Sequence, residues 1–118
     1  MYTLYGIPNC DTVKKARTWL EENGVEYKFH DYKKEGITAD RIEDWYKEFP
    51  WDKIVNKAST TWKELSDAEK AIVVDGKSAI GIIVSHTSVI KRPVIEDASG
   101  KAMVVGFKKD LYEEIFLK

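Results

Sequence analysis

The only cysteine of this 118-residue chain, Cys10, lies in the stretch YGIPNCDTV, between a short apolar run and the start of an amphipathic pattern. A helix that begins just after Cys10 would turn unpaired backbone N–H groups and the positive end of its dipole toward the sulfur, which favours the thiolate. Lys14, one turn further on, adds positive potential, whereas the carboxylate of Asp11 opposes it. The pattern therefore predicts a nucleophilic thiol at the start of a helix.

A structural interpretation of Cys10 also exists, because a free cysteine is often a small, buried hydrophobic residue. Its place after a predicted strand and a proline-containing turn favours the reactive interpretation. Residue 13 is valine, so the motif is not C-x-x-C, and any disulfide chemistry at Cys10 needs an external thiol. Thr12 offers a hydroxyl to a thiolate, although it is also an ordinary residue for a first helical turn.

The dipeptide Arg92–Pro93, at the start of the stretch RPVIED, is the second feature that can do chemistry. The planar guanidinium of arginine binds anions through a fork of N–H groups. Proline is tolerated as the first residue of a strand. The residues alone leave two interpretations of Arg92 open: a ligand for an anion at the site, or a solvent-facing side chain at a strand edge.

The chain around Cys10 is predicted to form a strand, a helix and a second strand. Residues 2–6 and 25–32 alternate in polarity and are rich in β-forming side chains. Residues 11–23 have an apolar stripe at helical spacing and stop at Gly24; the stripe is Val13, Ala16 and Leu20. Short joints between these elements predict a right-handed crossover and parallel strand pairing.

The middle of the chain is predicted to be helical. A helix capped by Thr38 and stopped by Pro50 has the strongest apolar stripe, formed by Ile42, Trp45, Tyr46 and Phe49. Several short helices are expected over residues 51–88, where two capping-box patterns occur: Thr61 with Glu64, and Ser66 with Glu69. The residues of this region expected to face inward are Ile80, Ile83 and Val84.

The end of the chain reads as a hairpin followed by a helix. The stretches RPVIED and KAMVVGF, joined by ASG, predict two antiparallel strands. The closing helix is expected to turn Leu111, Tyr112, Ile115 and Phe116 inward. The predicted class is α/β: one domain over residues 1–118, whose core is residues 1–34 and 90–118 and whose helical insert, about 37–89, follows the second strand.

Composition excludes several classes of function. Nineteen basic and 20 acidic residues leave a net charge of −1, which argues against direct nucleic-acid binding. No apolar run is long enough to span a bilayer and the N-terminus lacks signal-peptide features, so we expect a cytoplasmic protein with no membrane partner. One cysteine and two histidines give no metal-site spacing, and neither a metal nor a bound organic cofactor is expected.

Three segments together resemble the arsenate reductase (ArsC) family, in particular its Spx- and YffB-like subgroup: LYGIPNCDTVKKARTWLEENGVEYKFHDY, TTWKELS and VIKRPVIED…VVGF. The resemblance covers almost the whole chain. It implies a thioredoxin-like fold, a four-stranded mixed sheet flanked by helices, with Pro93 in the cis form beside Cys10 and Arg92 pointing into the site. It also implies a thiol-dependent reductase with Cys10 and Arg92 as catalytic residues; the residues expected to bind substrate are Thr12, Lys14, Asn56 and Pro93.

The chain also departs from the family's pattern. The glutaredoxin-dependent arsenate reductases hold their oxyanion with three arginines, of which only Arg92 is matched; Asn56 and Gly106 stand at the other two positions. A histidine that precedes the family's cysteine is replaced by Gly6. Each lost charge-assisted hydrogen bond is worth about 1.5–3 kcal/mol, which predicts poor arsenate reduction.

The resemblance implies two sets of partners. For a reductase, glutathione is the expected co-substrate, and glutathione or a glutaredoxin would resolve an intermediate on Cys10. The alternative is an Spx-like regulator that binds RNA polymerase through its α subunit. Regulators of that type commonly have a C-x-x-C redox switch, which Val13 removes here.

Overall fold

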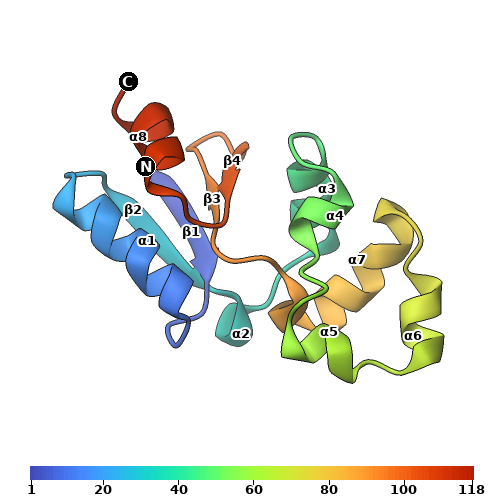
Figure 1. Cartoon of the computed structure of the whole chain (residues 1–118). Helices are drawn as coiled ribbons and strands as arrows, with labels where there is room; N and C mark the ends of the chain where they lie inside the picture. Colours follow the sequence, from blue (N-terminus) through green and yellow to red (C-terminus); the bar gives the residue numbers. More distant parts are fainter.

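The computed structural model describes residues 1–118 and shows a sheet with helices on both of its faces (Figure 1). In chain order the elements are β1 (Tyr2–Gly6), α1 (Asp11–Glu22), β2 (Tyr27–Asp31), α2 (Tyr32–Glu35), α3 (Ala39–Tyr46), α4 (Trp51–Ile54), α5 (Thr60–Glu64), α6 (Asp67–Ile72), α7 (Gly76–Ser85), the 3-10 helix η1 (Thr87–Val89), β3 (Val94–Glu96), β4 (Ala102–Val105) and α8 (Lys109–Phe116). No helix combines the length and the apolar character that crossing a membrane requires.

The strands form one mixed sheet in the order β2-β1-β3-β4. β1 and β2 are parallel and joined through α1, whereas β3 is antiparallel to both β1 and β4. The predicted four-stranded mixed sheet is therefore confirmed, with its parallel pair and its C-terminal hairpin.

Side chains from one face of the sheet form a core with α1 and α8. Leu4, Ile95 and Val104 of the strands contact the apolar residues of the two helices; the helical members are Val13, Ala16, Trp19, Leu20 and Tyr112. Leu4 and Tyr5 point to opposite faces, as neighbours in a strand must. The helix that begins after Cys10 is thus fixed to the sheet along its whole apolar stripe.

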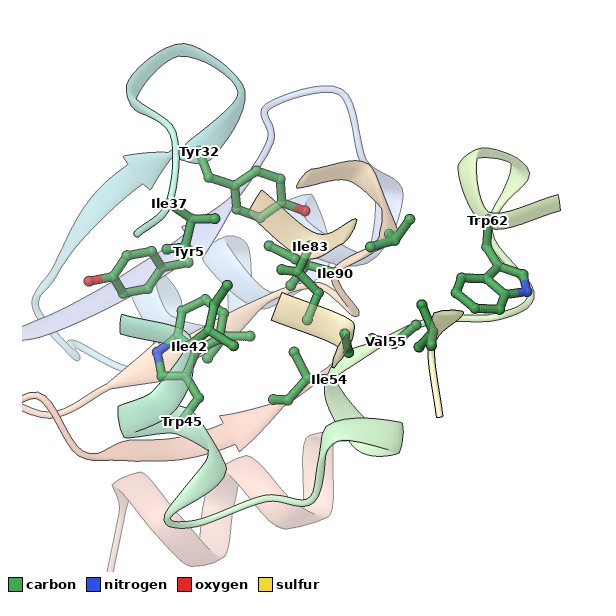
Figure 2. Close-up of a cluster of buried hydrophobic side chains, with 14 of the residues drawn as sticks. Tyr5, Tyr32, Ile37, Ile42, Trp45, Ile54, Val55, Trp62, Ile83 and Ile90 are labelled. Carbon is green, nitrogen blue, oxygen red and sulfur yellow. The ribbon is translucent and has the colours of Figure 1, made fainter. Parts of the chain in front are cut away.

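The opposite face of the sheet packs against the helices between β2 and β3. Tyr5, Val94 and Ala102 of the strands join a larger cluster whose other members come from α2, the insert helices and their connections (Figure 2). Trp45 of α3 has no exposed surface and lies at the sheet side of this cluster. The insert is therefore packed directly on the strands that carry the site.

Several predicted helix ends are confirmed. Cys10 is the N-cap of α1, and Thr38 caps α3 by accepting a hydrogen bond from Arg41 N at 3.2 Å. Ser66 and Glu69 form both hydrogen bonds of a capping box at the start of α6.

Two predicted helix ends are wrong. The Thr61–Glu64 box does not form, because α5 starts earlier and Ser59 caps it by accepting from Trp62 N at 3.1 Å. Pro50 does not end the preceding helix; α3 stops at Tyr46, and Pro50 is the N-cap of α4.

Two residues predicted to face inward are exposed. Val84 is 40% exposed, while Ile83 beside it is fully buried. Leu111 is 38% exposed, whereas Tyr112 is fully buried against α1 and the sheet. In each helix the apolar pattern extends one residue beyond the buried stripe, and Leu111 lines the cavity described below.

Candidate active site

An open cavity of about 500 Å³ surrounds Cys10. Four segments that are far apart in the sequence line it: residues 10–12 at the start of α1, residues 49–56 around α4, residues 91–92 before β3, and residues 105–111 between β4 and α8. The fold therefore places the predicted nucleophile where the core meets the helical insert.

Cys10 lies at the base of α1 in an extended conformation (φ −118°, ψ 123°) and is partly exposed. Its carbonyl oxygen accepts the first helical hydrogen bond from Lys14 N at 2.9 Å. Its sulfur does not cap the helix, so the thiol is not occupied by a structural hydrogen bond. Cys10 is the N-cap of α1, where the helix dipole and the unpaired first-turn N–H groups favour negative charge.

Arg92 lines the cavity beside Cys10, and the Arg92–Pro93 peptide bond is cis. Pro93 is buried and does not line the cavity. Its carbonyl accepts from Gly106 N at 2.8 Å, which ties the start of β3 to the end of β4. Arg92 itself makes one long contact, from Nη1 to Ser88 O at 3.5 Å, so most of its donors have no protein partner.

Basic side chains surround the cavity, and no carboxylate lines it. Lys53, Lys91, Arg92 and Lys108 come from three of its four segments. Sequence reasoning missed the three lysines; the adjacent pairs Lys91–Arg92 and Lys108–Lys109 were the available signal. Such a concave surface of one sign attracts anions.

The other residues named from the sequence divide into two groups. Thr12 and Asn56 line the cavity. Asn56 Oδ1 accepts from Ala58 N at 3.0 Å, which leaves the amide nitrogen as a donor toward the cavity. Lys14 is exposed on α1 and does not line the cavity.

Apolar side chains form the remaining wall: Phe49, Val105, Phe107 and Leu111. The ring of Phe107 packs edge-on against Tyr112, with centroids 4.8 Å apart. Tyr112 also donates its hydroxyl to Gly106 O at 2.6 Å. α8 therefore fixes the turn at Gly106, where φ is +88°, and with it the shape of this wall.

Tyr32, at the start of α2, is a buried residue near the site that the sequence did not reveal. It is 1% exposed, and its hydroxyl makes no hydrogen bond. Burial raises the pKa of this hydroxyl; Arg92 acts to lower it, and Cys10 and Asp31 act to raise it. Tyr32 is thus a protonated, unpartnered donor among the charges of the site.

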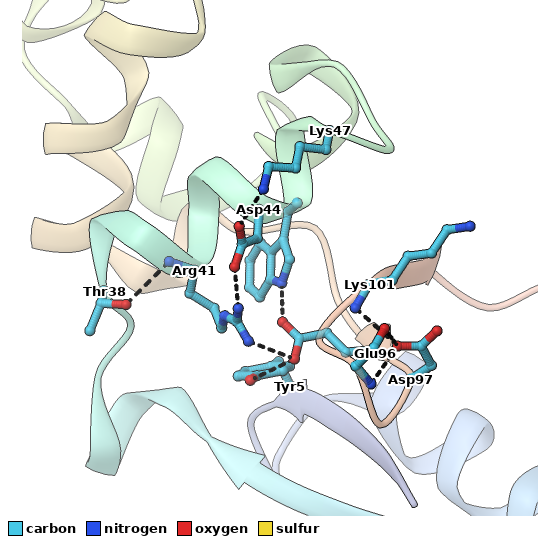
Figure 3. A network of polar contacts seen from close by, with 10 residues as sticks. Tyr5, Thr38, Arg41, Asp44, Lys47, Glu96, Asp97 and Lys101 are labelled. Carbon is cyan, nitrogen blue, oxygen red and sulfur yellow. Dashed lines mark hydrogen bonds and ion pairs between the residues drawn. The ribbon is translucent and has the colours of Figure 1, made fainter.

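A second buried polar group, Glu96 of β3, joins the sheet to the insert away from the cavity (Figure 3). It accepts from Tyr5 Oη at 3.0 Å, from Trp45 Nε1 at 2.6 Å and from Arg41 Nη1 at 3.2 Å. Burial and the charge of Glu96 raise the pKa of Tyr5 to about 12. Arg41 also pairs with Asp44 of the same helix, so the network holds α3 on the strand that follows Arg92.

No three histidine, cysteine, aspartate or glutamate side chains lie together where they could hold a metal ion. The residues that line the cavity bring one thiol together with four cationic side chains.

Comparison with known proteins gives consistent matches over nearly the whole chain. A sequence model of the ArsC family matches residues 5–115. A relative from Haemophilus influenzae, named only as an uncharacterized protein, is 40% identical over 116 residues, which are 98% of this chain and 99% of the relative. The global transcriptional regulator Spx of Listeria innocua is 30% identical over 112 residues, 93% of this chain and 82% of the regulator. Among solved structures, the YffB protein superimposes with a TM-score of 0.90 at 46% identity, covering 98% of both chains.

Proposed function

Because this chain belongs to the ArsC family, we propose that it is a thiol-dependent reductase in which Cys10 is the nucleophile and glutathione the co-substrate. The observation that carries the proposal is the cavity, which brings one partly exposed thiol together with four cationic side chains and no carboxylate. The protein's four-stranded mixed sheet, with helices on both faces, is the thioredoxin-like fold that it shares with the YffB structure.

The reaction has two exchange steps. In the first, the Cys10 thiolate attacks one sulfur of a disulfide substrate; the S–S bond breaks, and the other sulfur leaves as a thiolate. In the second, an external thiol attacks the mixed disulfide on Cys10 and restores the Cys10 thiolate. The net result is that one half of the substrate disulfide is released as a thiol, while the other half leaves as a new disulfide with the external thiol, which has lost its proton. Cys10 is the only cysteine, so the resolving thiol comes from glutathione or a glutaredoxin.

The cavity supplies binding groups for an anionic thiol compound. The guanidinium of Arg92 presents a planar fork that matches a carboxylate. Lys53 and Lys108 add positive charge, while Asn56 and Thr12 add an amide and a hydroxyl. Glutathione has two carboxylates and a thiol, and its binding would place the sulfur near Cys10.

Arsenate is a poorer candidate for the substrate. Asn56 and Gly106 both line the cavity, and they stand where the resemblance to the glutaredoxin-dependent arsenate reductases implies arginines. Neither residue supplies a charged donor, and lysines bind oxyanions without the fork of a guanidinium. We therefore propose that this chain reduces arsenate weakly.

Alkylation of the protein tests this proposal, because Cys10 is the only site that reacts. The rate with neutral iodoacetamide at pH 7, read from the intact mass, is expected to be higher for the folded protein than for the protein in urea. Folding is expected to raise the alkylation rate by a larger factor with anionic iodoacetate than with iodoacetamide, because the four cations attract the anionic reagent. A folded protein that reacts with both reagents no faster than the unfolded chain would refute the proposed function.

A second candidate function is favoured by the similarity to Spx, which is a global transcriptional regulator. On this proposal the chain binds RNA polymerase through the α subunit, without a C-x-x-C redox switch, because residue 13 is the buried Val13. Purified α subunit passed over the immobilised protein tests the proposal. Retention of the α subunit would support a regulator, and its passage without delay would refute one.

A further inference from the structure

The hydroxyl of Tyr32 is the single buried side-chain polar atom with no hydrogen-bond partner. A buried polar group without a partner is destabilising, and such groups are rare in folded proteins. Phenylalanine would fill the same space without this cost. The hydroxyl is therefore a feature of the protein that its packing does not explain.

The fold places Tyr32 at the same end of the sheet as the proposed nucleophile. Tyr32 directly follows β2, whose last residue, Asp31, pairs with Gly6 at the end of β1, so the loop to Cys10 and the start of α2 leave the same end of the sheet. α2 also contacts η1, and Ser88 of η1 accepts the hydrogen bond from Arg92. Figure 2 shows the Tyr32 side chain entering the cluster with its hydroxyl at the inner end.

We propose that the Tyr32 hydroxyl donates a hydrogen bond to the sulfur of Cys10 in its thiolate form, while its oxygen accepts from the guanidinium of Arg92. This inference rests on the proposed function, which requires that thiolate. It assigns the unpartnered donor an acceptor that exists only when Cys10 is ionised. Before ionisation the thiol is a weak acceptor, and the hydroxyl stays unpaired.

The chemistry of a phenol suits this role. Burial raises the pKa of Tyr32, so the group stays protonated and no proton moves to the sulfur. A neutral donor stabilises the thiolate without competing for an anionic substrate, which remains with the cations of the cavity. The charged groups of the surrounding elements are Arg92, Lys53, Lys91 and Lys108 of the cavity, Asp11 and Lys14 in the first turn of α1, and Asp31 at the end of β2. None of these changes when the hydroxyl is removed.

The variant Tyr32→Phe tests the inference, because it removes only the hydroxyl. The rate of iodoacetamide alkylation of Cys10 is measured from pH 5 to pH 10. The midpoint of this profile is expected to move up by about half to one pH unit, so that the rate at pH 6 falls about three- to tenfold. The urea midpoint is expected to stay the same or rise, because a phenyl ring leaves no unpaired donor.

Tyr46→Phe is the matched control, since Tyr46 donates its hydroxyl to Gly76 O at 2.9 Å within the insert. It is expected to lower the urea midpoint and to leave the alkylation profile unchanged. A Tyr32→Phe profile that superimposes on a reactive wild type overturns this inference alone. A wild type whose Cys10 reacts as an ordinary thiol overturns the proposed function as well, so the two failures are distinguishable.

Discussion

Val13 occupies the space that a side chain on residue 6 would need. A Cβ built on Gly6 would lie 2.9 Å from Val13 Cγ2 and 3.3 Å from Val13 Cγ1. Gly6 ends β1, and Val13 is fully buried in the first turn of α1. The pair sets how closely the helix that begins after Cys10 approaches the strand before it. Any side chain at Gly6 would have to displace the methyl groups of Val13 from this position.

Gly6→Ala is therefore expected to lower the free energy of unfolding by about 1–3 kcal/mol, the usual cost of overpacking a core. In a Val13→Ala background Gly6→Ala should lower the free energy of unfolding by clearly less, because alanine lacks the two Val13 methyl groups that a Cβ at residue 6 would meet. Urea denaturation measures both values. Gly81→Ala is the control: the site is open and lies within α7, so alanine should stabilise by about 0.5–1 kcal/mol. An equal cost of Gly6→Ala in both backgrounds would contradict this account.

The Glu96 network is expected to contribute strongly to stability. Glu96→Gln removes the charge that faces Arg41 and places an amide N–H₂ either against the donor of Trp45 or against the donors of Tyr5 and Arg41, which bind the other carboxylate oxygen. The expected loss of free energy of unfolding is about 3 kcal/mol, as for other broken buried ion pairs. Glu43→Gln on the exposed side of α3 is the matched control and should change stability by less than about 0.5 kcal/mol. Similar effects of the two variants would rule out the proposed contribution of the network.

Alkaline pH is expected to destabilise the protein through its buried tyrosines. Burial raises the pKa of four of the six tyrosines; Tyr5 and Tyr46 reach about 12, and Tyr32 and Tyr112 are raised further. The folded state then holds protons that the unfolded state releases near pH 10, so stability is full below pH 10 and falls as the pH rises toward 12. Absorbance at 295 nm should show that four tyrosines of the folded protein ionise at a higher pH than the other two. In urea all six tyrosines should ionise together near pH 10. Ionisation of all six near pH 10 in the folded state would contradict this.

Oxyanion binding is expected to depend on the residue at position 56. In the wild type, arsenate should slow the iodoacetamide alkylation of Cys10 only at high concentration. Asn56→Arg adds a guanidinium to the cavity wall and should lower the protecting concentration about tenfold, the equivalent of one charge-assisted hydrogen bond. Asn23→Arg adds the same charge on the exposed end of α1, remote from the cavity, and should leave protection unchanged. Equal protection in all three proteins would show that the arginine count does not decide oxyanion binding.

Much of the architecture could be predicted from local sequence patterns. Alternation in the strands, helical stripes and caps such as Thr38 and Ser66 are signals within a few residues, and they placed the four strands and the short helices of the insert. The errors at Thr61 and Pro50 are also local: Ser59 caps α5 in place of Thr61, and Pro50 starts α4 after α3 has ended at Tyr46.

The site was only partly predictable, because its parts meet through the tertiary structure. Cys10 could be named from its sequence context, whereas Arg92 was left open by the residues and was assigned to the site only through the resemblance to the ArsC family. Lys53 and Lys108 look like solvent-facing charges until α4 and the end of β4 bring them to the cavity. Glu96 and its partner Tyr5 are 91 residues apart, and no local pattern distinguishes such a buried carboxylate from an exposed one.

Reaction of the protein with glutathione disulfide tests the central claim most directly. The intact mass should increase by one glutathionyl group, faster for the folded protein than for the protein in urea, and Cys10→Ser should show no increase. Added glutathione with a glutaredoxin should then return the protein to its original mass. Formation of the adduct and its removal would establish Cys10 as a nucleophile that an external thiol resolves. A folded protein that forms no adduct, or forms it no faster than the unfolded chain, would contradict the account.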